Sequence, residues 1–239
     1  MKVKDIKNRV TLLNVAASLF MQIASVISAL IVPRLILETF GSSTNGLVSS
    51  ISQFLNYITL VEGGITGVIS ANLYKPLVDG DNKKLSSVLT TARSFYRKIG
   101  VLFIGYSVVL GVVYPFFVDT DYEYWYVFAL TLTLSIGLML QYMFSLTFTT
   151  LLNADKKVYI VAFTGTVLTI ANIILTLVVV NVYPDIIVLK FASAILFVLQ
   201  PIFYGLYINK HYNIDWNADK DNSLIKQRWN GFAINLAFF

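Results

Sequence analysis

The stretch VYIVAFTGTVLTIANIILTLVVVNV, residues 158–182, contains no charged side chain. As an α-helix it rises about 1.5 Å per residue, which is enough to cross the roughly 30 Å hydrocarbon core of a bilayer. Strands of a membrane barrel alternate apolar and polar residues over about ten positions, and this stretch does not. The stretch therefore predicts a transmembrane α-helix.

Further apolar segments of similar length predict an all-α, polytopic membrane protein. They lie at about residues 11–37, 46–71, 99–118, 125–151 and 186–208. The composition agrees, because 56% of the 239 residues are hydrophobic and only 13% are charged, against about a quarter in soluble domains. Mean hydropathy is +0.71. We expect an N-terminal lobe of six transmembrane helices over residues 1–208, followed by a cytoplasmic linker at 209–229.

Basic residues set the predicted orientation of these spans. Of the 18 Lys and Arg residues, all except Arg34 and Lys190 lie before the first span or after the second, fourth and sixth. The intervening loops carry acidic residues instead: Glu38, Asp119, Asp121, Glu123 and Asp185. Because cytoplasmic segments are enriched in Lys and Arg, we expect a multi-pass protein of the cytoplasmic membrane with its N-terminus in the cytoplasm. This distribution accounts for the basic pI without a nucleic-acid partner.

The residues at the two termini indicate whether the first span is retained and whether a further span begins. Lys2, Lys4, Lys7 and Arg9 precede the first span, as in a secretory signal, but the apolar run is too long and lacks a small-residue cleavage site, so we expect it to be retained. The chain turns apolar again at residues 231–239, which as a helix would rise only about 13 Å. We expect residues 230–239 to be the start of a seventh span that is cut short. The alternative is a natural end in a short interfacial helix.

Composition and motifs argue against several kinds of site. The chain has no cysteine and a single histidine, His211, so it offers no thiolate or His-cluster metal site and argues against a Ser-His-Asp triad. It lacks the GxxxxGK[ST] loop of ATP-driven transporters. The D-x-D match at residues 79–81 lies among Asp, Gly and Asn residues typical of a turn. We therefore predict no enzyme activity, no metal and no cofactor.

The second span carries hydroxyl and amide residues along one side. They recur at intervals of three and four: Ser49, Ser52, Asn56, Thr59, Gly63, Thr66 and Ser70. This spacing places them on one helix face, which would meet other helices or water rather than lipid. Two interpretations stay open, because such groups either hold helices together or line a hydrated path.

The candidate substrate-binding residues are amides and ionisable residues inside the spans. They are Arg34, Glu62, Asn56, Lys190, Gln141 and Asn172. The amides favour a hydrated central path, and the charges are candidates for function because charge is costly within a bilayer. For Arg34 and Lys190 the alternative is a side chain that reaches the outer headgroups. For Glu62 the alternative is a protonated, hydrogen-bonded carboxyl without a role in transport.

Short motifs around the second span resemble those of a known superfamily. The run PRLILETFG at residues 33–41, with the Asn-Gly-Leu at 45–47, places an Arg, a Leu and paired Gly residues across the first outer hairpin. LVEGGI at 60–65 carries an acidic-Gly element, and LYKP at 73–76 with GDNKKL at 80–85 forms a basic segment. These motifs resemble polysaccharide biosynthesis membrane proteins of the multidrug/oligosaccharidyl-lipid/polysaccharide exporter superfamily, which includes O-antigen and lipid II flippases.

The resemblance implies two six-helix lobes around a central cavity with alternating access, of which this chain would supply the N-terminal lobe. It implies a transporter that moves an undecaprenyl-pyrophosphate-linked oligosaccharide across the cytoplasmic membrane for surface polysaccharide synthesis. Arg34 would hold the pyrophosphate. The implied partners are the bilayer, the lipid-linked oligosaccharide and, in addition, a polysaccharide polymerase and glycosyltransferases.

Other functions remain as alternatives. A cation-coupled small-molecule efflux antiporter of the same superfamily would use Glu62 to carry the coupling proton or cation. A membrane polymerase typically needs a long outer loop, and the longest one predicted here is residues 38–45, which argues against that class. A non-transporting membrane scaffold would need none of the candidate residues.

Overall fold

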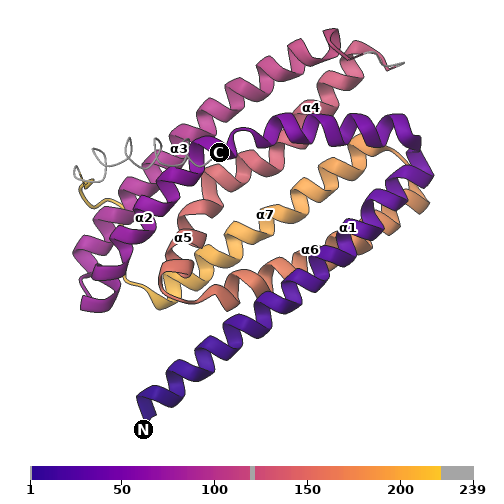
Figure 1. Cartoon of the computed structure of the whole chain (residues 1–239). Coiled ribbons are helices and arrows are strands. Elements are labelled where there is room, and N and C mark those ends of the chain that lie inside the picture. The colour runs from indigo at the N-terminus through magenta and orange to yellow at the C-terminus, as the bar shows by residue number, and fades with distance from the viewer. Residues whose placement is uncertain (1, 119–121, 222–239) are drawn as a thin grey trace.

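A computed structural model describes residues 2–118 and 122–221, and every regular element in these ranges is helical (Figure 1). The elements are α1 (Lys2–Asn56), α2 (Thr59–Asp79), α3 (Asn82–Val113), the short 3-10 helix η1 (Tyr114–Phe116), α4 (Tyr124–Leu140), the π-helix η2 (Gln141–Ser145), α5 (Leu146–Ala154), α6 (Val158–Val182) and α7 (Ile186–His211). The all-α prediction is confirmed for these residues. The predicted seventh span, at residues 230–239, lies outside them.

Within the described residues, five helical stretches are long and apolar enough to cross a membrane. They are Arg9–Asn56, Asn82–Phe116, Tyr124–Ala154, Val158–Val182 and Ile186–His211. These stretches support a multi-pass membrane protein. Residues 158–182 form α6 with the predicted boundaries. Six complete spans remain a prediction, because α2 is not among the five stretches.

Helix α1 consists of two limbs that meet at Gly41. This residue has φ 82° and ψ 172°, a conformation open essentially to glycine alone. The chain reverses direction along α1, so that its first limb lies beside α6 and its second limb leads into α2 (Figure 1). The first limb packs closely on α6, since a Cβ at Gly165 would lie 3.0 Å from the Cε of Met21. The predicted outer loop at residues 38–45 is therefore a bend between helical limbs.

The predicted second span, residues 46–71, is not one continuous helix. Helix α1 ends at Asn56 and α2 begins at Thr59, with a turn between them. Side-chain hydroxyls take carbonyls at this break: Tyr106 donates to Phe54 at 2.6 Å and Thr59 donates to Asn56 at 2.7 Å. Both hydrogen bonds end on carbonyls that border the turn, and the Phe54 carbonyl also accepts from the backbone N–H of Tyr57 at 3.2 Å.

Residues 74–98, the basic stretch between the predicted second and third spans, are predicted to form a loop but are mostly helical. Helix α2 ends in Gly80, which adopts a left-handed conformation with φ 68°, and Asp81 caps α3 by accepting a hydrogen bond from the backbone N–H of Lys84 at 2.9 Å. The predicted turn at residues 79–81 is confirmed. The prediction of a loop around this turn is wrong, because Lys75 lies in α2 and the other basic residues, between Lys83 and Lys98, lie in α3.

Residues 212–221, here called the strap, leave α7 and bind the ends of α3 and α5. The Tyr212 hydroxyl donates to the Asp155 carboxylate at 2.5 Å, and burial together with this carboxylate raises the pKa of Tyr212. Lys84 and Asp221 form an ion pair at 2.7 Å. The described part of the predicted linker at 209–229 is therefore bound to the helices.

An aromatic contact also holds the strap in place. The Trp216 ring lies under the Arg93 guanidinium, 5.0 Å from centroid to Cζ, and meets the Phe148 ring edge-on at 5.9 Å. The strap therefore joins α3, α5 and α7 at one end of the bundle.

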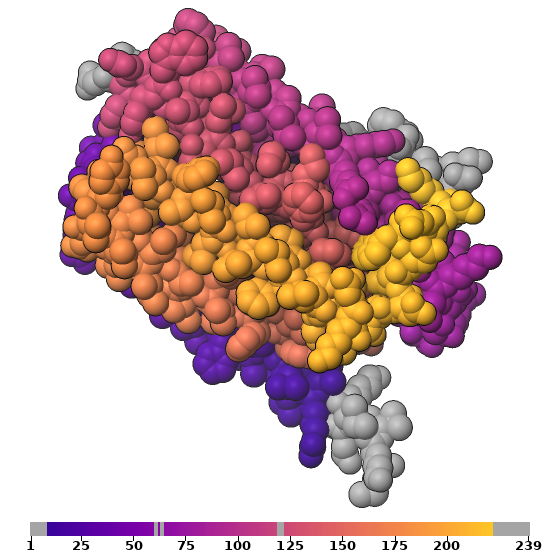
Figure 2. Space-filling model, turned by 180° about the vertical axis from the view of Figure 1, so that it is seen from behind, coloured from indigo at the N-terminus to yellow at the C-terminus, as the bar shows by residue number. Residues whose placement is uncertain are grey.

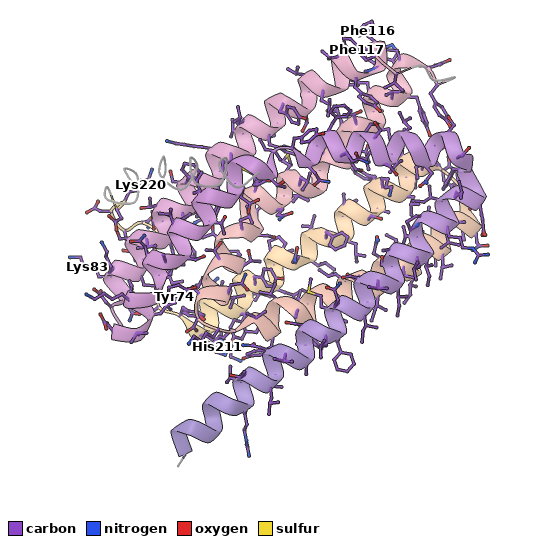
Figure 3. All side chains as sticks on the ribbon, viewed as in Figure 1. Tyr74, Lys83, Phe116, Phe117, His211 and Lys220 are labelled. Carbon is purple, nitrogen blue, oxygen red and sulfur yellow. The ribbon has the colours of Figure 1, made fainter. Side chains whose placement is uncertain are left out.

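The charged and aromatic ends of the bundle are opposite each other. Tyr74, Lys83, His211 and Lys220 gather at one end, and Phe116 and Phe117 lie at the other (Figure 3). The charge distribution predicts that the first of these ends faces the cytoplasm.

Single-cysteine labelling tests this orientation, because the chain contains no cysteine of its own. Phe117→Cys is expected to react with a membrane-impermeant maleimide on intact cells, since residue 117 is 82% exposed. Lys83→Cys should react only after the cells are permeabilised. The reverse pattern would contradict the predicted orientation.

The bend at Gly41 predicts a difference between two glycine substitutions. Gly41→Ala forces a side chain into a conformation that costs about 1–3 kcal/mol, so its melting temperature in detergent should fall by several degrees. Gly46→Ala is the matched control, because it lies in a helix with no atom within 4 Å of the added Cβ. Equal melting temperatures for the two variants would show that the bend does not need glycine.

Candidate functional site

Helix α7 has two chemically different sides. Its exposed stripe is apolar: Val188, Phe191, Ile195, Leu199, Ile202 and Leu206. The opposite side carries Lys190, Ser193, Phe197, Gln200 and Tyr204, at intervals of three and four residues. We call these five residues the inner face of α7. Seen from behind, α7 crosses the surface of the molecule beside α5, α6 and the strap (Figure 2).

A cavity of about 350 Å³ lies between this inner face and the helical run from α4 to α5. Its lining comprises Leu134, Gly137, Leu138, Leu140, Gln141, Ser145, Phe197 and Gln200. Two of the lining side chains are carboxamides. The amide N–H of Gln200 donates to the Tyr204 hydroxyl at 3.0 Å, whereas Gln141 is exposed and its side chain makes no hydrogen bond within the described residues.

Lys190 lies on the inner face of α7, toward the end opposite the strap. It is partly buried, and none of the ion pairs among residues 2–118 and 122–221 includes it. Seven residues separate it from Phe197, which corresponds to about 10 Å along the helix axis. Its charge is therefore close to the cavity, although Lys190 does not line it.

Glu62 belongs to a second polar cluster, at the start of α2. Thr66 donates to its carboxylate at 3.4 Å and shares a hydrogen bond of 2.9 Å with the Tyr96 hydroxyl. Tyr96 in turn meets Thr150 at 3.2 Å, so the cluster links α2, α3 and α5. The buried Tyr142 hydroxyl is close enough to interact with the Glu62 carboxylate, although their geometry falls short of a hydrogen bond.

Arg34, which the resemblance predicts to hold a phosphate, forms an ion pair with Glu38. Its guanidinium Nε donates to Glu38 at 2.7 Å, and the two side chains are 78% and 56% exposed. An exposed pair one helical turn apart contributes little to stability. Arg34 is thus neutralised locally by a residue of the same helix.

The remaining predicted residues are separate from these clusters. Asn56 is exposed at the end of α1, and the side-chain oxygen of Asn172 is buried in α6 without a hydrogen-bond partner among the described residues. No hydrogen bond or ion pair in the described ranges joins any two of the six predicted residues. The site therefore divides into the inner face of α7 with its cavity, the Glu62 cluster and isolated groups.

Tyr96 and Phe197 are site residues that sequence reasoning missed. Tyr96 fell in the segment predicted as a basic loop, although it lies in the middle of α3 and is fully buried. Phe197 is apolar and gave no signal until its neighbours Ser193 and Gln200 were seen on the same side of α7. The spacing of these neighbours could have identified it.

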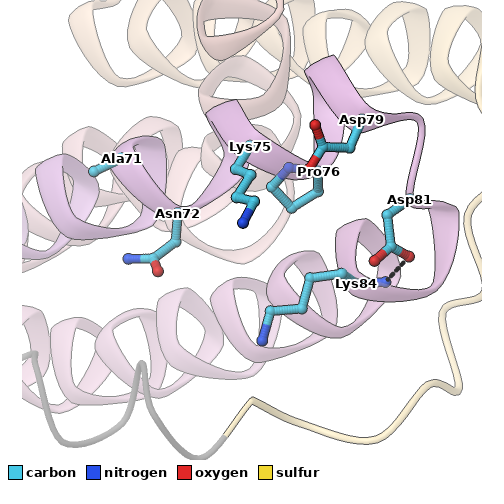
Figure 4. A pocket seen from close by; sticks show the side chains of 7 residues that line it. All are labelled: Ala71, Asn72, Lys75, Pro76, Asp79, Asp81 and Lys84. Carbon is cyan, nitrogen blue, oxygen red and sulfur yellow. Dashed lines mark hydrogen bonds between the residues drawn. The ribbon is translucent and has the colours of Figure 1, made fainter.

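A second cavity of about 350 Å³ lies between α2 and α3 at the end that holds the strap (Figure 4). Two lysines and two aspartates line it: Lys75, Lys84, Asp79 and Asp81. Lys84 is paired with Asp221, and Asp81 caps α3, so two of these charges serve the local structure. The lining therefore carries charges of both signs.

Comparisons with protein-family models, with curated proteins and with solved structures find no match to this chain. In the part of the chain that the structure describes, no group of three or more His, Cys, Asp or Glu side chains could hold a metal ion.

Proposed function

We propose that this chain is part of a transporter that moves an undecaprenyl-pyrophosphate-linked oligosaccharide across the cytoplasmic membrane for surface polysaccharide synthesis. The observation that carries the proposal is the two-sided character of α7. Its exposed stripe is apolar, and its inner face combines a cation, hydroxyls, an amide and an aromatic ring beside a cavity. A lipid-linked oligosaccharide has the same two parts, an apolar tail and a polar anionic head.

The two sides of α7 suggest how such a substrate would be handled. The tail would stay in the bilayer, which the exposed apolar stripe also contacts. The head would follow the inner face, where polar groups replace part of its hydration. Rocking of this lobe against a second one, as the resemblance implies, would open the path first to one side of the membrane and then to the other.

Lys190 is the best-placed cation for the pyrophosphate. It is partly buried, has no acidic partner among the described residues, and shares a helix face with Gln200. Its ammonium group would form charge-assisted hydrogen bonds with phosphate oxygens. Arg34, to which the resemblance points, would first have to leave Glu38, so we assign it a secondary role at the outer end.

The role of Lys190 predicts a loss of transport when its charge is removed. Hydrogen bonds to charged groups contribute about 1.5–3 kcal/mol, so Lys190→Gln should lower surface polysaccharide by about tenfold or more at equal membrane abundance. Lys190→Arg keeps the positive charge and should keep most of the surface polysaccharide. Arg34→Gln removes one positive charge elsewhere, serves as the charge-matched control, and should have a smaller effect. Normal polysaccharide with Lys190→Gln would remove this residue from the site.

The Glu62 cluster favours a second candidate, a cation-coupled efflux antiporter. Glu62 is half-buried beside the Thr66, Tyr96 and Tyr142 hydroxyls, which is a suitable setting for a carboxyl that gains and loses a proton. In that case Glu62→Gln should abolish drug resistance while surface polysaccharide stays intact. Loss of polysaccharide with unchanged drug resistance would instead support the flippase.

A further inference from the structure

The cavity beside α7 is formed at an irregular turn of its neighbouring helix. In η2 the backbone N–H of Leu146 donates to the carbonyl of Gln141, five residues earlier, in place of the usual four. A π-turn of this kind inserts an extra residue into a helix and is frequent at functional sites. Here it lies at Gln141 and Ser145, which both line the cavity, and Gln141 has no hydrogen bond to its side chain within the described residues.

The lining is mostly apolar, with three leucines, a glycine and a phenylalanine, and it carries three polar side chains that can bond to hydroxyl groups: Gln141, Ser145 and Gln200. A carboxamide both donates and accepts hydrogen bonds, so Gln141 and Gln200 can each bond to neighbouring hydroxyls of one ring. Phe197 offers an aromatic surface for the apolar face of such a ring. None of the lining residues is charged, so the cavity suits a neutral group and not a phosphate.

The volume and the position of the cavity also suit a ring that carries hydroxyl groups. A volume of about 350 Å³ is at the lower end for ligand sites, which suits a single ring better than a long chain. Phe197 and Gln200 lie on the side of α7 away from its lipid-exposed stripe, so an acyl chain would reach the cavity less easily than a polar head. Lys190 lies about 10–15 Å away along the same helix face.

We propose that this cavity binds one uncharged sugar ring of the substrate head, with Gln141 and Gln200 bonded to its hydroxyls and Phe197 packed against its face. The inference rests on the proposed function and deepens it, because it separates recognition of the sugar from recognition of the phosphate. The amides and the aromatic ring select the sugar, and Lys190 binds the pyrophosphate whatever sugar it carries.

Binding measurements with two lipids that differ only in the sugar test whether the sugar and the phosphate are recognised separately. The intact protein in nanodiscs is titrated with undecaprenyl diphosphate and with the same lipid carrying N-acetylglucosamine. The glycosylated lipid should bind about tenfold more tightly. Gln141→Leu and Gln200→Leu should each remove most of that difference and leave the affinity for undecaprenyl diphosphate within about twofold, which also shows that the variants are folded.

Asn181→Leu is the control, because it replaces an exposed amide of α6 that lies outside the cavity. It should change neither affinity. Equal binding of the two lipids by the unmodified protein, or equal losses for both lipids in the amide variants, would overturn the sugar site while leaving the proposed transport intact. Failure of both lipids to bind would contradict the proposed function itself.

Discussion

A bilayer provides no water to the backbone, so every N–H and C=O group of a membrane span has to find its partner inside the protein. The long helices of this chain meet that requirement along most of their length. Several hydroxyl side chains follow the same rule, because Ser107, Thr131, Thr166 and Thr176 each donate to the carbonyl four residues earlier. These hydroxyls serve their own helices and say little about a substrate.

The same requirement makes the irregular positions informative. The helix breaks after Asn56, where the Tyr106 hydroxyl from α3 takes a carbonyl, and it widens at η2, where the hydrogen bond shifts by one residue. The first irregularity lies one turn before Glu62 and the second begins at Gln141. Among the buried polar side chains, only the Asn172 oxygen and the Thr90 and Tyr142 hydroxyls lack a hydrogen-bond partner within the described ranges, and the exposed Gln141 amide also lacks one. Few buried polar side chains are thus left without a partner, and the unpartnered Gln141 lines the cavity beside α7.

Hydropathy was sufficient to predict the long helices but not their interruptions. Residues 158–182 form one helix with the predicted ends, because its length and lack of charge leave no other solution. The turn at Tyr57–Ile58 lies inside an apolar stretch that hydropathy predicted as one span, and its contact with Tyr106 of α3 is remote in sequence, so the local pattern gave no sign of it. Tyr96 was hidden for a related reason, since the basic residues around it indicated a loop while α3 continues through them. The candidate residues were identified by type, but only the structure shows that Gln141 shares a cavity with Gln200 and that Arg34 is paired with Glu38.

We propose that the inner face of α7 carries a polar head across the membrane while the tail stays in lipid. The most direct measurement reconstitutes the intact protein into liposomes that hold a fluorescent undecaprenyl-pyrophosphate-linked oligosaccharide in both leaflets. A membrane-impermeant quencher then reports how fast the head groups of the inner leaflet become accessible. The account predicts rapid and nearly complete quenching with the protein, and much slower quenching with its Lys190→Gln variant. Quenching that stops at the outer leaflet, as in liposomes without protein, would contradict it.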